Sequence, residues 1–136
     1  MQISAELNID FNAKDYMNRT AFYYACCQGH SEIVDMLIQK YAELNIDLNS
    51  KDFIDQTAFL VACNMGHSEI VEIILKKYVE FNIDLNTRNY FDKTAFHSVC
   101  ENGNIKMARM LVQNSRAFTI NLKLEKIRQF ELVIQV

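Results

Sequence analysis

The 136-residue sequence contains no proline and only three glycines. Tight turns depend heavily on these two residue types, so their scarcity favours helices over a turn-rich β protein. Half of the residues are apolar and 23% are charged, which is typical of a folded protein rather than a disordered chain. The length allows one compact domain or three to four stacked repeat units.

Charge excess and long apolar runs are also missing. The formal net charge of −3 is too small to indicate a nucleic-acid or membrane partner. Glu6 and Asp10 interrupt any apolar run near the start, so the pattern of a secretory signal is absent. No stretch approaches the ~18–20 apolar residues of a membrane helix. We expect an intracellular, cytoplasmic protein, with the nucleus as an alternative location.

One segment occurs three times at a period of 37 residues. Thr57–Val71 reads TAFLVACNMGHSEIV, Thr20–Val34 reads TAFYYACCQGHSEIV, and Thr94–Ala108 reads TAFHSVCENGNIKMA. A fixed period in this range indicates a repeat array. We predict a first unit at residues 9–45, a middle unit at 46–82 and a third unit at 83–119. Residues 1–8 are either the tail of an upstream unit or a cap, and residues 120–136 form a degenerate cap or a partial repeat.

Each unit carries the signals of two helices. The first helix begins after a threonine that can cap free backbone N–H groups, covers Ala21–Gln28 in the first unit, and ends at Gly29. The second helix begins near Ser31, and apolar residues such as Ile33 and Val34 recur on one of its faces. Such a helix pair cannot bury its apolar face alone, so we expect stacked units to share a core.

The four cysteines follow the same period. Cys26, Cys63 and Cys100 occupy corresponding positions, and Cys27 is the additional one. Corresponding positions in stacked helices lie about 8–10 Å apart, beyond the ~7 Å Cα separation that a disulfide spans. No Cys-x-x-Cys or His-x-x-x-His spacing indicates zinc. We interpret the cysteines as small buried thiols in a reducing compartment, and we expect neither a metal nor a cofactor.

The repeated unit resembles the ankyrin repeat, whose signature Thr-Pro-Leu-His-x-Ala belongs to a β-turn followed by two helices. The corresponding segments are Thr20–Ala25 (TAFYYA), Thr57–Ala62 (TAFLVA) and Thr94–Val99 (TAFHSV), and Gly-His precedes Ile-Val by two residues in the first two units. The resemblance covers about residues 9–119. It implies an all-α, ankyrin-type solenoid of stacked helix-turn-helix repeats joined by β-hairpin-like loops.

The sequence departs from the family pattern in several places. Alanine replaces the family's proline, phenylalanine replaces its leucine, and the motif histidine remains only as His97. Asn18, Asp55 and Asp92 replace the turn glycine, and these residue types tolerate a left-handed backbone. The unit is also longer than the family's usual length of about 33 residues. We expect Ala42–Asn45 and the equivalent residues to add one turn, ~6 Å, to the second helix.

The polar residues do not suggest an enzyme. An active site needs a nucleophile, an acid–base pair or a metal placed once in a pocket, whereas this chain distributes its distinctive polar residues by period. His30 and His67 recur 37 residues apart beside glycines, which favours structural hydrogen bonding over catalysis. We therefore predict a non-enzymatic protein.

The resemblance implies that a partner contacts the hairpin tips and the end of each first helix. Carried over position by position, the tip residues are Tyr16, Met17, Arg19, Phe53, Ile54, Gln56, Tyr90, Phe91 and Lys93, and the helix-end residues are Cys27, Gln28, Asn64, Met65, Glu101 and Asn102. The tips are aromatic or apolar in every unit, with basic residues nearby, as in binding hot spots. The alternative is that the aromatic residues pack along neighbouring hairpins and stiffen them.

These observations favour a protein–protein interaction module acting as a scaffold, an adaptor or an inhibitor. Two alternatives remain open: a spacer or fragment of a longer array, and a module that self-associates through Phe130–Val136, whose pattern suits a strand or a helix face. A nucleic-acid or anionic-ligand binder that uses the basic residues after Asn104 is a further alternative. The mixed charge of the tips argues against it.

Overall fold

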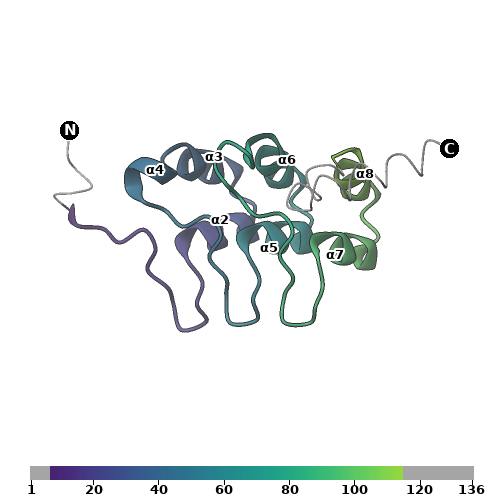
Figure 1. Ribbon diagram of the computed structural model, residues 1–136, viewed down its shortest axis with the longest axis horizontal. Helices are drawn as coiled ribbons and strands as arrows, with labels where there is room; N and C mark the ends of the chain where they lie inside the picture. Colours follow the sequence, from purple (N-terminus) through teal and green to yellow (C-terminus); the bar gives the residue numbers. More distant parts are fainter. Residues whose placement is uncertain (1–6, 115–136) are drawn as a thin grey trace, which may run out of the picture.

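The computed structural model describes residues 7–114, which contain helices and no strand. The helices are α2 (Ala21–Gln28), α3 (Ser31–Gln39), α4 (Tyr41–Leu44), α5 (Ala58–Met65), α6 (Ser68–Lys77), α7 (Ala95–Asn102) and α8 (Ile105–Gln113). Figure 1 shows α2, α5 and α7 side by side in one row and α3, α6 and α8 in a second row, with three hairpin arms extending from the first row. The predicted all-α solenoid is confirmed. Segment 120–136, with Phe130–Val136, lies outside the described residues.

The predicted signals for the start and end of the first helices are confirmed. The Thr20 hydroxyl accepts a hydrogen bond from the backbone N–H of Tyr23, and Thr57 caps α5 in the same way, both at 3.2 Å. In the third unit His97 adds a contact, because its Nδ1 accepts from the backbone N–H of Thr94 at 3.1 Å. The glycine after each first helix is left-handed. The short first helices therefore all begin and end at corresponding positions.

The core lies between the two rows of helices and continues from unit to unit. Helix α5 packs between α2 and α7, and α6 contacts both α3 and α8. Phe59 on α5 is 1% exposed and lies at the centre of this core. Because the middle unit is covered on both sides, it carries the largest share of fully buried side chains. Stability should therefore depend strongly on contacts between neighbouring units.

In the first and middle units the additional residues do not lengthen the second helix, so the prediction is wrong there, while the equivalent residues 116–119 of the third unit lie outside the described residues. In the first unit α3 ends at Gln39, and the separate one-turn helix α4 follows. Asn45 then adopts a left-handed backbone with φ of 55°, and the N–H of Ile46 donates back to the carbonyl of Tyr41 at 2.8 Å. A left-handed residue cannot continue an α-helix, so the chain turns here toward the next hairpin arm.

Asparagine side chains join the arms of neighbouring units. The amide nitrogen of Asn12 donates to the carbonyl of Asn45 at 2.6 Å, and its oxygen accepts from the N–H of Asp47 at 2.7 Å. Asn49 makes the same two bonds at the next junction, to the carbonyl of Asn82 at 2.9 Å and from the N–H of Asp84 at 2.8 Å. The two functional groups of one amide thus satisfy two backbone groups that no helix or strand pairs. These bonds fix the register in which units stack.

Candidate functional site

One side-chain oxygen closes each hairpin turn. Oδ1 of Asp15 accepts hydrogen bonds from the backbone N–H groups of Met17 and Arg19, both at 2.9 Å. Asp52 and Asn89 do the same in the next two units, at 2.8–3.0 Å. The residue that replaces the family's turn glycine is left-handed in every unit, as predicted. Each tip therefore has a defined shape, and its side chains are held outside the turn.

Backbone hydrogen bonds also connect the tips across units. The N–H of Phe53 donates to the carbonyl of Met17 at 3.1 Å, and the N–H of Tyr90 donates to the carbonyl of Ile54 at 2.8 Å. Corresponding tip residues therefore follow one another in line along the array. We call Tyr16, Phe53 and Tyr90 the aromatic row.

The side chains of the aromatic row are exposed. Tyr16 is 92% exposed, Phe53 58% and Tyr90 74%. Phe91 beside them is also exposed, and its ring contacts that of Tyr90 edge to face at 5.8 Å. The neighbouring Met17 and Ile54 are half-buried and form the base of the tips. Such exposure argues against the alternative in which the rings stiffen the arms, since backbone bonds rather than rings join the hairpins.

Comparison with the middle unit distinguishes side chains that every unit exposes from side chains that are exposed because a neighbouring unit covers only one side. Phe96 in the third unit is 44% exposed, although its counterpart Phe59 is buried. Ile33 likewise stands exposed in the first unit, against the prediction from its helical pattern, while its counterpart in the middle unit is buried. Phe53 and Met65 have neighbouring units on both sides and are still 58% and 52% exposed. Their exposure is therefore a property of the repeated unit and does not depend on the position of that unit in the stack.

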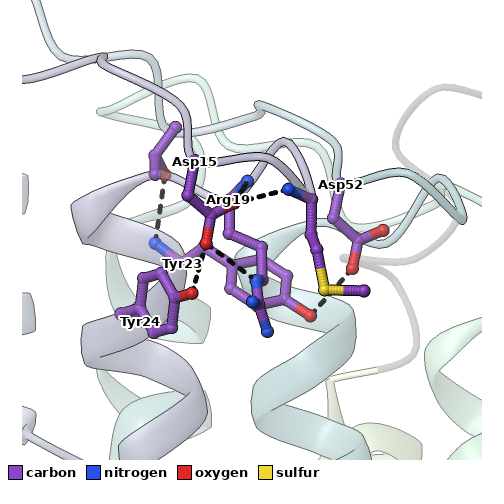
Figure 2. A network of polar contacts seen from close by, with 7 residues as sticks. Asp15, Arg19, Tyr23, Tyr24 and Asp52 are labelled. Atoms are coloured by element: carbon purple, nitrogen blue, oxygen red, sulfur yellow. Dashed lines mark hydrogen bonds and ion pairs between the residues drawn. The ribbon is translucent and has the colours of Figure 1, made fainter.

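A compact polar network surrounds the first tip (Figure 2). The Tyr24 hydroxyl donates to the Asp15 carboxylate, and Nε of Arg19 lies 3.2 Å from the same group. The Arg19 guanidinium also lies 4.9 Å from the centre of the Tyr24 ring. The hydrogen bond from Tyr24, followed by the backbone N–H groups of Arg19 and Met17 and the charge of Arg19, lowers the pKa of Asp15 to about 2 despite some desolvation.

A buried hydrogen bond links the first and middle units beneath the tips. The Tyr23 hydroxyl donates to Oδ2 of Asp52 at 2.8 Å, as Figure 2 also shows. Burial and the adjacent Asp52 carboxylate raise the pKa of Tyr23. Asp52 thus supports its own tip through one oxygen and holds the neighbouring unit through the other. Sequence reasoning did not identify Tyr23 and Asp52 as partners, because this contact spans 29 residues.

The predicted basic tip residues are already engaged within the chain. Arg19 pairs with Asp15, and Nζ of Lys93 lies 2.8 Å from Glu101 on α7. The second pair brings a tip residue and a helix-end residue together in the third unit. Gln56, the equivalent residue of the middle unit, is half-buried. These residues frame the tips but offer fewer free charges than the sequence suggested.

The helix-end residues form a second exposed strip at the other end of the first helices. Asn64 and Met65 are exposed at the end of α5, and Asn102 of α7 donates its amide to the carbonyl of Asn64 at 2.6 Å. The corresponding carbonyl in the first unit is that of Cys27, and Nε2 of His67 forms a hydrogen bond with it at 2.8 Å. The structural role predicted for His67 is confirmed, whereas the His30 ring makes no hydrogen bond within residues 7–114.

A row of basic residues near the tips was not assigned to the binding surface from the sequence. Lys14, Lys51 and Arg88 are exposed and occupy corresponding positions, two residues before each member of the aromatic row. Arg88 lies 3.6 Å from Asp92, whereas Lys14 and Lys51 form no ion pair within the described part of the chain. The signal that could have revealed this basic row is its period. We call these three residues the basic row.

The cysteines are only partly as predicted. Cys26 and Cys63 are buried, and burial raises the pKa of both thiols. Cys100 is exposed, so the prediction of a buried thiol is wrong there, because no helix of residues 7–114 follows α7 in the first row. No group of three or more metal-binding side chains occurs in residues 7–114. No helix in this range is long and apolar enough to cross a membrane.

Comparison with known families gives two matches. The sequence model described as "Ankyrin repeats (3 copies)" matches residues 44–123, and the one described as "Ankyrin repeat" matches residues 17–52. A comparison with curated proteins finds no matching relative. The two family matches together span residues 17–123, which include all three helix pairs and the tips apart from Asp15 and Tyr16 of the first one.

Proposed function

The chain belongs to the ankyrin repeat family, whose members generally act as protein–protein interaction modules, and from this premise we propose that it binds another protein through its tips and helix ends. The chain would act as a scaffold, an adaptor or an inhibitor by occlusion, without catalysing a reaction. The binding surface comprises the aromatic row, the adjacent residues Met17, Arg19, Ile54, Gln56, Phe91 and Lys93, and the helix-end residues Asn64, Met65, Glu101 and Asn102.

The exposure of Phe53 and Met65 in the middle unit carries this proposal. Both residues have neighbouring units on either side, so a missing neighbour does not explain why they face solvent. Large apolar side chains on a rigid surface offer contact area at a low entropic cost. Aromatic residues of this kind dominate the binding energy of many protein interfaces.

The proposal is tested by affinity capture with matched surface variants. Tyr90→Ser and Phe91→Ser remove exposed rings from one tip, and Val79→Ser removes an equally exposed apolar side chain away from the tips. We expect the tip double variant to lose proteins that the native chain and Val79→Ser both retain, with melting temperatures within a few degrees of each other. Retention of every captured protein by the tip variant would contradict the proposal.

A spacer within a longer array is the second candidate. Exposed apolar residues of the first unit favour it, since Ile9 and Ile33 are exposed while their counterparts Ile46 and Ile70 are buried at a junction between units. A spacer would use these end faces and leave the tips unoccupied. It therefore predicts that the Tyr90 and Phe91 variants lose no binding at all, which the same capture experiment decides.

A further inference from the structure

The distance between neighbouring rings of the aromatic row limits which conformation a bound partner segment can have. Stacked helices are roughly 8–10 Å apart, and the tips follow this spacing because backbone hydrogen bonds join them in register. A polyproline II segment rises about 3.1 Å per residue with three residues per turn, so every third side chain advances by about 9 Å along the same side. Such a segment would place one side chain against each of Tyr16, Phe53 and Tyr90.

A helix matches the same surface less well. Apolar residues of a docked helix recur on every turn, about 5.4 Å apart, so alternate ones would fall between neighbouring tips. The backbone hydrogen bonds from Phe53 to Met17 and from Tyr90 to Ile54 occupy those intervals, and the side chains of Met17 and Ile54 are half-buried there. A helix needs a broad apolar groove, whereas the tips offer one row of rings, with a second ring, that of Phe91, only at the third tip.

The basic row adds a requirement of charge. Lys14 and Lys51 are exposed without an ion pair in residues 7–114, and Arg88 shares only a solvent-exposed contact with Asp92. Each basic residue lies two positions before an aromatic tip residue, so the two rows run in parallel along the array. A segment seated on the rings would therefore be favoured by carboxylates along its adjacent edge. The exposed Asp55 and Asp92 on the same hairpins, and the net charge of −3, disfavour a continuous polyanion.

We propose that the aromatic and basic rows together bind an extended, acidic protein segment with an apolar residue at every third position and acidic residues beside them. This inference rests on the proposed function and specifies the partner class. The segment would lie along the stack, its apolar side chains on the rings of Tyr16, Phe53 and Tyr90 and its carboxylates near Lys14, Lys51 and Arg88.

Labelled synthetic peptides test the proposed occupant by fluorescence anisotropy with the full chain. The probes are LEPLEPLEPLEP and LPELPELPELPE, which place glutamate on either side of leucine because the segment can run in either direction. We expect one of them to bind at least about tenfold more tightly than LLLLEEEEPPPP, which has the same composition without the period. Replacing every glutamate by lysine should weaken binding several-fold at low salt.

Matched variants locate the peptide on the protein. Phe53→Ser should weaken binding about tenfold, whereas Val79→Ser, at a side chain that is 66% exposed on the same unit, should leave it unchanged. Lys51→Gln should weaken binding a few-fold and reduce its salt dependence, whereas Lys76→Gln should do neither. Melting curves of each variant control for loss of fold. The replaced side chains of Phe53 and Val79 both lie on the surface.

Several outcomes would overturn the inference. Equal binding of the periodic and grouped peptides would remove the spacing argument, and tighter binding of an acidic helix-forming peptide would assign a helix instead. Tighter binding of oligo(U) would assign a nucleic acid. If no peptide is discriminated but the Tyr90 and Phe91 variants still lose captured proteins, the extended occupant is wrong while the proposed function stands. If those variants also lose no captured protein, both the extended occupant and the proposed function are contradicted.

Discussion

The middle and third units share the phenylalanine and the cysteine of their first helices at corresponding positions but do not bury them alike. Phe59 and Cys63 of the middle unit are buried, whereas Phe96 and Cys100 of the third unit are exposed. Helix α5 has a first-row helix on each side, whereas α7 packs against α5 alone among the described helices of the first row. Burial of a given residue type in this fold therefore depends on the neighbouring unit and not on the residue alone.

The tips behave differently from the helices in the same comparison. Phe53 and Tyr90 are both exposed, although one belongs to the covered unit and the other to the third. Both side chains stay more than half exposed whether one or two units adjoin them, because the hairpins extend away from the helix rows (Figure 1). The comparison thus separates residues that stack units from residues that the units present to solvent.

Thiol reactivity should show the largest difference between the two units. Cys100 is exposed, while burial both shields the Cys63 thiol and raises its pKa, which lowers the fraction of reactive thiolate. We expect iodoacetamide to modify Cys100 on the order of a thousandfold faster than Cys63 in native buffer, since Cys63 must wait for the structure to open. Timed quenching and peptide mass spectrometry measure the two rates. In denaturant they should converge, and similar rates in native buffer would contradict the described burial.

Truncation of the corresponding phenylalanines should give the next largest difference. Phe59→Ala creates a cavity in the core and should lower the free energy of unfolding by ~3–5 kcal/mol. Phe96→Ala removes a side chain that is already 44% exposed, and should cost only about 1 kcal/mol. Urea unfolding, with the m-value compared between variants, measures both losses. A loss below 1 kcal/mol for Phe59→Ala would be inconsistent with its place in the core.

The smallest expected effect concerns Asp15 at the first tip. Because the folded-state pKa of about 2 lies below the ordinary value of 3.8, the carboxylate stabilises the fold above about pH 4, and this contribution disappears as the pH falls toward 2. Removing the leading cause with Tyr24→Phe should return the pKa toward its ordinary range. NMR titration of the Asp15 carboxyl measures the shift, and Tyr16→Phe serves as the control. An unchanged pKa in Tyr24→Phe would rule out the hydrogen bond as its main cause.

Local sequence signals predicted the helices well because their causes are local. A threonine that caps free N–H groups and a left-handed glycine act within a few residues, so α2 was predicted with its observed bounds. The break between α3 and α4 was not predicted, because the helical pattern continues through Lys40, whose backbone leaves helical geometry at the end of α3. Asn45 and the return bond from Ile46 to Tyr41 then end α4. A helix-compatible pattern does not exclude a turn.

The candidate surface was predicted only in part for the same reason. The period identified the aromatic row, since a repeated aromatic residue in a loop is visible in the sequence itself. It did not predict that Arg19 and Lys93 pair with Asp15 and Glu101, because those contacts depend on side-chain geometry. The basic row carried the same period but lay outside the positions that family resemblance assigns to binding.

The sequence by itself determined the repeat, the helix pair within each repeat and the residue types at the tips, because these follow from period, capping and local backbone preference. Only the tertiary structure decided which of the repeated residues are buried, which charges are paired, and how Asn12 and Asn49 align one unit with the next. The physical reason is that these properties arise between units, where contacts join residues about one repeat apart.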